Sequence, residues 1–135
     1  PHWSGLPPFL ARNGGLESGL MILHYVSASA IARIRLLASP AALTNIPVSA
    51  EKEDHVSMGS TASERLIEIC NLASCVLANE MIIASSALDF REEKPGVGVV
   101  RLHGWVRAVS EPIVCDRSLS DDTMALADKI LKEGV

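Results

Sequence analysis

Apolar residues recur at helical spacing along two long stretches of this chain. One stretch covers residues 18–38 and the other residues 57–90; the second contains no proline, and its only glycine, Gly59, falls in its first turn. Apolar positions three to four residues apart are typical of amphipathic helices. We therefore predict two long helices, with Ser18 as a candidate N-cap for the first.

Proline and glycine divide the rest of the chain. Residues 1–17 and 39–56 each contain proline and are predicted to be irregular. Beyond a break at 94–96, shorter helices are predicted over 99–110 and 121–133. Runs of β-branched residues are scarce and no internal repeat is visible. The pattern predicts an all-α fold.

The second predicted helix is too long for a small compact domain. At about 1.5 Å per residue, residues 57–90 would span roughly 51 Å, whereas a domain of this size has a radius of gyration of about 14 Å. Its apolar residues are spread around the helix axis, and a helix that is apolar all round is buried on all sides. We expect the chain to supply helices to a larger bundle, built with the rest of its polypeptide, with copies of itself, or with both.

Charge and composition narrow the classes of function. The net charge is −4 and the pI about 5.5, and no basic stripe with interleaved aromatics occurs, which argues against a nucleic-acid partner. The apolar first helix carries Arg33 and Arg35, which are costly inside a membrane, so we expect it to be buried among other helices. No signal peptide is recognisable, and we expect a cytoplasmic protein.

The three cysteines, Cys70, Cys75 and Cys115, are odd in number and form no C-x-x-C motif. On one helix, Cys70 and Cys75 would point about 140° apart. We interpret them as reduced, buried thiols.

The densest polar run, Glu51-Lys52-Glu53-Asp54-His55, directly precedes the second long helix. Acidic residues there stabilise the helix dipole, so the run is either a helix start or a functional loop that the helix holds in place. A zinc site is disfavoured, because adjacent residues seldom converge on one ion. Signatures of nucleophile elbows, P-loops and dinucleotide-binding turns are absent.

Ordered blocks of sequence around this run resemble the histidine ammonia-lyases, within the aromatic amino acid lyase family. The resemblance extends over about residues 4–91, and the rest matches only in general character. The blocks are LPPFL (6–10), NGGLESGLMI (13–22), IPVSA (46–50), EDHVSMG (53–59) and LDFR (88–91).

The resemblance implies a homotetrameric, all-helical enzyme with a central bundle of long helices. Residues 1–91 would supply bundle helices with a substrate-side loop at 39–56, and residues 92–135 a C-terminal helical region. Family members eliminate ammonia from an aromatic amino acid, giving urocanate from histidine. Their electrophile is a methylidene-imidazolone group made from an internal Ala-Ser-Gly.

This chain has no Ala-Ser-Gly, because its two Ser-Gly pairs follow Trp3 and Glu17. The resemblance thus implies that the chain is the C-terminal part of such an enzyme, inactive alone, with the electrophile in an upstream part. Its first residue, proline rather than methionine, fits that expectation. The catalytic base should also lie elsewhere, because Tyr25, the single tyrosine, matches no catalytic tyrosine.

The resemblance assigns a substrate-binding role to Glu53, which matches a glutamate that faces the substrate and is able to bond its imidazole or ammonium group. Lys52 replaces the usual glutamine, and its charge would pair with Glu53 or the substrate carboxylate, or change the substrate. Asp54 and His55 are interpreted as structural, bonding the start of the helix. The alternatives are an aminomutase or another aromatic lyase of the family, and a non-catalytic helical assembly module.

Overall fold

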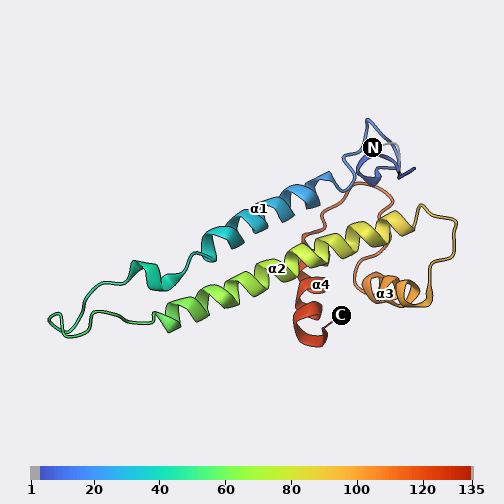
Figure 1. Cartoon of the computed structure of the whole chain (residues 1–135). Helices are drawn as coiled ribbons and strands as arrows, with labels where there is room; N and C mark the ends of the chain where they lie inside the picture. Colours follow the sequence, from blue (N-terminus) through green and yellow to red (C-terminus); the bar gives the residue numbers. More distant parts are fainter. Residues whose placement is uncertain (1–3, 135) are drawn as a thin grey trace.

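The computed structural model describes residues 4–134, which form four α-helices and two short 3-10 helices (Figure 1). Within these residues β-pairing is limited to two isolated bridges, Gly14–Glu17 and Val48–Glu53, so the all-α prediction is confirmed. The elements are η1 (Pro8–Leu10), α1 (Met21–Leu37), η2 (Ala41–Thr44), α2 (Gly59–Leu88), α3 (Val97–Arg107) and α4 (Ser120–Glu133).

Helix α2 is the central helix, and α1, α3 and α4 all contact it. Its 30 residues correspond to a length of about 45 Å. Helix α1 runs antiparallel beside it, α4 packs across it, and α3 lies near its C-terminal end (Figure 1). The segment between α1 and α2 extends beyond the helices at the opposite end.

The hydrophobic core occupies one end of this arrangement. All buried residues of α2 fall between Ser74 and Ser86. Among the residues between 31 and 73 whose burial is described, Ala41 is the one buried residue. We call residues 31–73 the projecting end and residues 4–30 with 74–134 the packed end. The core cluster consists of Leu20, Leu23, Ala78, Ile82, Val106, Leu126 and Ala127.

A buried asparagine joins three helices in the packed end. Asn79 of α2 is fully buried. Its Nδ2 donates to Ser27 Oγ of α1 at 3.1 Å, and its Oδ1 accepts from Thr123 Oγ1 of α4 at 2.8 Å. Because buried amides are costly unless they are hydrogen-bonded, these contacts fix how α1 and α4 sit on α2.

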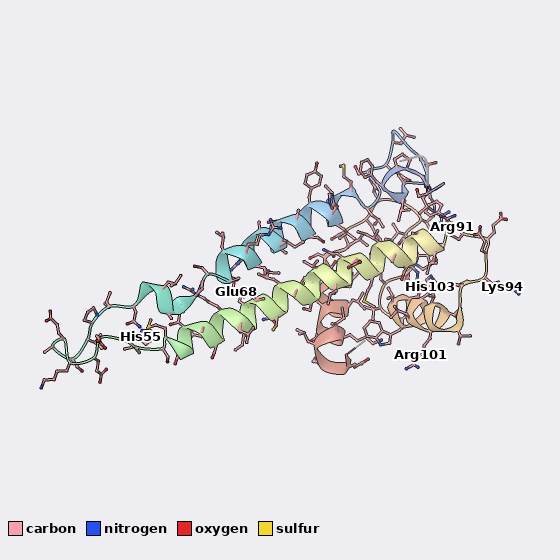
Figure 2. All side chains as sticks on the ribbon, viewed as in Figure 1. His55, Glu68, Arg91, Lys94, Arg101 and His103 are labelled. Carbon is pink, nitrogen blue, oxygen red and sulfur yellow. The ribbon has the colours of Figure 1, made fainter. Side chains whose placement is uncertain are left out.

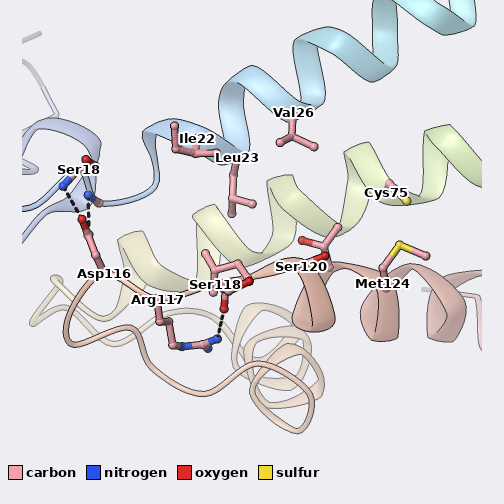
Figure 3. A pocket seen from close by; sticks show the side chains of 13 residues that line it. Ser18, Ile22, Leu23, Val26, Cys75, Asp116, Arg117, Ser118, Ser120 and Met124 are labelled. Carbon is pink, nitrogen blue, oxygen red and sulfur yellow. Dashed lines mark hydrogen bonds between the residues drawn. The ribbon is translucent and has the colours of Figure 1, made fainter.

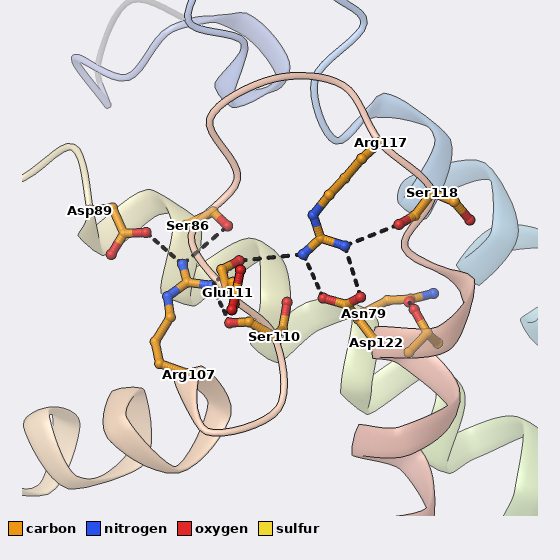
Figure 4. Close-up of polar contacts among 10 residues, drawn as sticks. Asn79, Ser86, Asp89, Arg107, Ser110, Glu111, Arg117, Ser118 and Asp122 are labelled. Atoms are coloured by element: carbon orange, nitrogen blue, oxygen red, sulfur yellow. Dashed lines mark hydrogen bonds and ion pairs between the residues drawn. The ribbon is translucent and has the colours of Figure 1, made fainter.

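Ion pairs attach α3 to the end of α2. Asp89 accepts from Arg107 at 2.6 Å (Figure 4) and contacts His103 Nε2 at 2.9 Å. His103 and Arg107 are four residues apart and therefore share one face of α3. Arg107 also reaches Ser86 Oγ at 3.4 Å, so its guanidinium spans the α2–α3 junction.

The start of α1 is held by a residue far along the chain rather than by a local cap. The predicted cap Ser18 is wrong: Leu20 occupies the N-cap position without a side-chain hydrogen bond. Instead Asp116 accepts from the backbone N–H groups of Ser18 and Gly19, at 2.8 and 2.9 Å. Gly19 has a φ of +56°, and a Cβ there would lie 2.4 Å from the carbonyl oxygen of Phe9.

The burial predicted for the cysteines is wrong, and the burial predicted for the first helix among other helices is not found within the described residues. Cys70 and Cys115 are exposed and Cys75 is half-buried, although all three are free thiols. In α1 only Leu23 is buried. Cys70, Cys75 and most of α1 lack cover because the outward faces of α1 and α2 have no covering helix within the described residues, whereas Cys115 lies on the connection between α3 and α4.

Helix α2 is the one helix, within residues 4–134, that has the length and apolar composition of a membrane-crossing helix. Long core helices of helical bundles share both properties.

Candidate functional site

The predicted substrate-binding residues lie on the loop that enters α2. Lys52 and Glu53 are exposed, as are all residues from 46 to 55. His55, on the same loop, lies at the far end of the molecule from Arg101 and His103 of α3 (Figure 2). The predicted site is therefore at the tip of the projecting end, outside the packed core.

The backbone at the tip is tightly turned. Val48 and Glu53 exchange backbone hydrogen bonds of 3.0 and 3.3 Å, and Lys52 N–H donates to Ser49 C=O at 3.2 Å. Ser49, Ala50 and Glu51 have φ values of 54°, 52° and 65°. Non-glycine residues rarely adopt this left-handed region, and where they do the strain often accompanies function. The turn fixes the backbone of Glu53 opposite Val48.

A second set of contacts closes the base of the loop. Asn45 Nδ2 faces both His55 Nδ1, at 3.4 Å, and the carbonyl oxygen of Val56. His55 therefore contacts the residue that precedes the loop, whereas it was predicted to bond the start of the helix. Within residues 4–134 the Asp54 side chain forms no hydrogen bond, contrary to the same prediction.

The side chains of Lys52 and Glu53 are available for external partners. Neither forms a hydrogen bond or ion pair through its side chain with the described part of the chain, so the suggested Lys52–Glu53 pair is absent there. An ionised carboxylate only accepts hydrogen bonds, whereas an ammonium group only donates them. These two residues are adjacent in the sequence, and their groups are able to bind a polar, charged ligand.

An apolar cavity lies elsewhere in the described part of the chain. It has a volume of about 510 Å³ and lies between α1, α2 and the start of α4 (Figure 3). Ile22, Val26 and Met124 give it apolar walls, and Cys75 and Thr123 add polar edges. It contains neither Lys52 nor Glu53, and no motif in the sequence pointed to it. The cavity lies next to the core, where a covering helix would complete the packing.

An ion pair in which the pKa of the carboxyl group is shifted lies beside this cavity. Arg117 binds Asp122 through two contacts of 2.8 and 2.7 Å (Figure 4). The hydrogen bond from Arg117 lowers the pKa of Asp122 below its usual value, although partial burial of the carboxyl opposes the shift. The pair joins the 108–119 connection to the first turn of α4, so its role is structural.

No group of three or more His, Cys, Asp and Glu side chains gathers as metal ligands would within residues 4–134. The candidate site that the sequence predicts is the loop at the projecting end, with Lys52 and Glu53. By fold and by site, the chain is a segment of a helical-bundle protein that presents charged side chains on a strained loop.

The chain belongs to the aromatic amino acid lyase family. The family model, described as aromatic amino acid lyase, matches residues 1–108. This is a family whose members depend on a methylidene-imidazolone group.

The similar proteins share one printed name. The chain is 44% identical over 130 residues to a histidine ammonia-lyase of Caldanaerobacter subterraneus and 42% identical over 131 residues to one of Myxococcus xanthus. It covers 25% and 26% of their lengths, so it spans about a quarter of these relatives. The crystal structure of histidine ammonia-lyase from Trypanosoma cruzi matches 96% of the chain with a TM-score of 0.86 and 33% identity, over 26% of that protein.

The residues present do not fit the family's electrophile. The family resemblance implies that this group forms from Ala-Ser-Gly, whereas in this chain tryptophan precedes Ser4–Gly5 and glutamate precedes Ser18–Gly19. Ser18 and Gly19 are also held through their backbone by Asp116. No step of the chemistry is therefore assigned to this group within the present chain.

Proposed function

We propose that this chain is the C-terminal part of a histidine ammonia-lyase, which eliminates ammonia from L-histidine to give urocanate. The identity to relatives of that name supports the proposal. The observation that carries it at the residue level is Glu53, an exposed carboxylate without an internal partner on a strained loop.

In this proposal Glu53 binds the substrate. Its carboxylate accepts a hydrogen bond from the imidazole ring or from the ammonium group, and such charge-assisted bonds are stronger than neutral ones. Lys52 lies next to it and donates to the substrate carboxylate. The electrophile that activates the leaving ammonia would come from an upstream part of the polypeptide, so the chain alone is inactive.

The other groups of the site would come from elsewhere in a homotetrameric, cytoplasmic enzyme. Tyr25 is exposed near the start of α1, at the opposite end of that helix from the loop. Apolar side chains on α2 also lack cover: Leu66 and Ile67 are 60% and 65% exposed. Exposed apolar surface of this kind marks an interaction site, and upstream helices or identical subunits would fill it.

The direct test replaces Glu53 in the complete enzyme. Glu53→Gln keeps the size of the side chain but removes its charge, and a hydrogen bond to a charged group contributes enough to predict a loss of roughly 10- to 100-fold in kcat/KM for histidine. Urocanate absorbance measures the rate. Glu51→Gln, an equivalent change on the same turn, is the control and should stay near the wild-type rate.

The same assay separates the alternatives. An aminomutase would convert an aromatic amino acid to its β-isomer, and product analysis would detect it. A helical assembly module would show no turnover with any aromatic amino acid. If Glu53→Gln and Glu51→Gln behave alike, Glu53 does not bind the substrate.

A further inference from the structure

The loop that carries Glu53 is tied together by side chains at one place only. Within the described residues, Asn45 with its contacts to His55 and Val56 makes the only side-chain hydrogen bonds of residues 45–58. Residues 46–55 are all exposed, so packing against the rest of the chain does not hold the two arms of the loop (Figure 2). The position of the tip depends on contacts within the loop.

The chemistry of these contacts requires an amide at position 45. The Val56 carbonyl only accepts hydrogen bonds, so the nitrogen of the Asn45 amide must face it. The same nitrogen lies 3.4 Å from His55 Nδ1, within reach of its second N–H when Nδ1 carries no proton. Aspartate offers no donor at this position, and serine offers only one.

The two sets of contacts form a closed ring. At the tip, Val48 and Glu53 are joined by reciprocal backbone hydrogen bonds. At the base, Asn45 joins Val56, which lies three residues before Gly59, the first residue of α2. The ring therefore fixes Glu53 relative to the start of the long helix. Without the base contact, no side-chain hydrogen bond would hold the Val48–Glu53 pair in position relative to α2.

We propose that Asn45 is a positioning residue for Glu53. It holds the loop so that the Glu53 carboxylate meets the substrate, without touching the substrate itself. This inference rests on the proposed function, because it acts through Glu53.

The test combines two substitutions in the complete enzyme. Asn45→Ala removes both donors and should lower kcat/KM for histidine about 10-fold, the loss expected for one to two hydrogen bonds. Asn45→Asp has nearly the same shape but lacks the donors, and it should lower kcat/KM for histidine at least as much as Asn45→Ala does. In the isolated chain, the midpoint of thermal unfolding should stay within about 1 °C, because the loop is exposed there and contributes little to the core.

The decisive measurement is Asn45→Ala in the Glu53→Gln background. If Asn45 acts through Glu53, the second substitution should change kcat/KM by less than about 2-fold there, since coupled residues are not additive. Equal losses in both backgrounds, or a wild-type rate for Asn45→Ala beside a slow Glu53→Gln, would overturn the inference alone. A wild-type rate for Glu53→Gln would overturn the substrate-binding role of Glu53 and this inference with it, whereas a wild-type enzyme that does not convert histidine would overturn the proposed function.

Discussion

The packed end and the projecting end are built from the same two helices but differ in what holds them. In the packed end, α2 buries Ala78, Asn79 and Ile82 against α1 and α4. In the projecting end, the same helix exposes Leu66 and Ile67 and carries no buried residue before Ser74. The difference shows that one end is stabilised by contacts within the chain, whereas the other has apolar faces that only further polypeptide would cover.

The largest expected effect comes from the core of the packed end. Leu126 is fully buried, and Leu126→Ala should lower the free energy of unfolding by about 2–5 kcal/mol, because it removes apolar contacts and leaves a cavity. Ile67→Ala, in the projecting end, should cost less than about 0.5 kcal/mol in the isolated chain. Urea denaturation followed by circular dichroism measures both.

The same pair of variants also tests how far the comparison holds in the complete enzyme. There, Ile67→Ala should become destabilising by an amount closer to that of Leu126→Ala, because neighbouring helices would bury it. An Ile67→Ala cost that stays negligible in the complete enzyme would show that the projecting end is exposed in the assembly as well.

A medium effect is expected from the buried polar contact. Thr123→Val preserves the shape of the side chain but leaves Asn79 Oδ1 without its 2.8 Å donor, and an unpaired buried acceptor costs about 1–3 kcal/mol. Thr61→Val, on the first turns of α2 in the projecting end, is the matched control and should be nearly neutral. If thermal or urea unfolding shows a similar loss of unfolding free energy for both variants, the packed end and the projecting end do not differ in how they are stabilised.

The smallest effect is a dependence on pH. Because the pKa of Asp122 is lowered by Arg117 in the folded chain, the pair stabilises the fold above the ordinary aspartate pKa of about 3.9. That stabilisation is lost as the pH falls through the lowered folded value. Asp122→Asn should therefore unfold with a weaker dependence on pH between about 5 and 2 than the wild type. Identical acid-unfolding curves would contradict this role.

The sequence predicted the helices well because their limits are set locally. Pro40 follows α1, and Pro95 with Gly96 directly precedes α3. All four predicted helices are found, with ends that differ by up to three residues. The contact at the start of α1 was not predictable in this way, because Asp116 lies 97 and 98 residues from the amides that it binds.

The candidate site was predictable only in part. Glu53 and Lys52 were identified from resemblance to a family, and their roles stay predictions. The shape of their loop carried no local signal, since Ser49, Ala50 and Glu51 adopt left-handed conformations without a glycine. The contact of Asn45 with His55 was not predictable from local sequence either, because the two residues are ten positions apart, on opposite sides of the turn at 49–52.

The uninterrupted length of α2 has a consequence for how this segment is able to change over evolution. Each residue added within Gly59–Leu88 would advance the loop by about 1.5 Å and rotate it by about 100° around the helix axis. A single insertion would thus turn Glu53 away from its present direction, whereas seven residues would nearly restore it two turns further out. The helix therefore sets both how far the loop extends and the direction in which Glu53 points. Insertions in the helix should be tolerated only in steps of about seven residues.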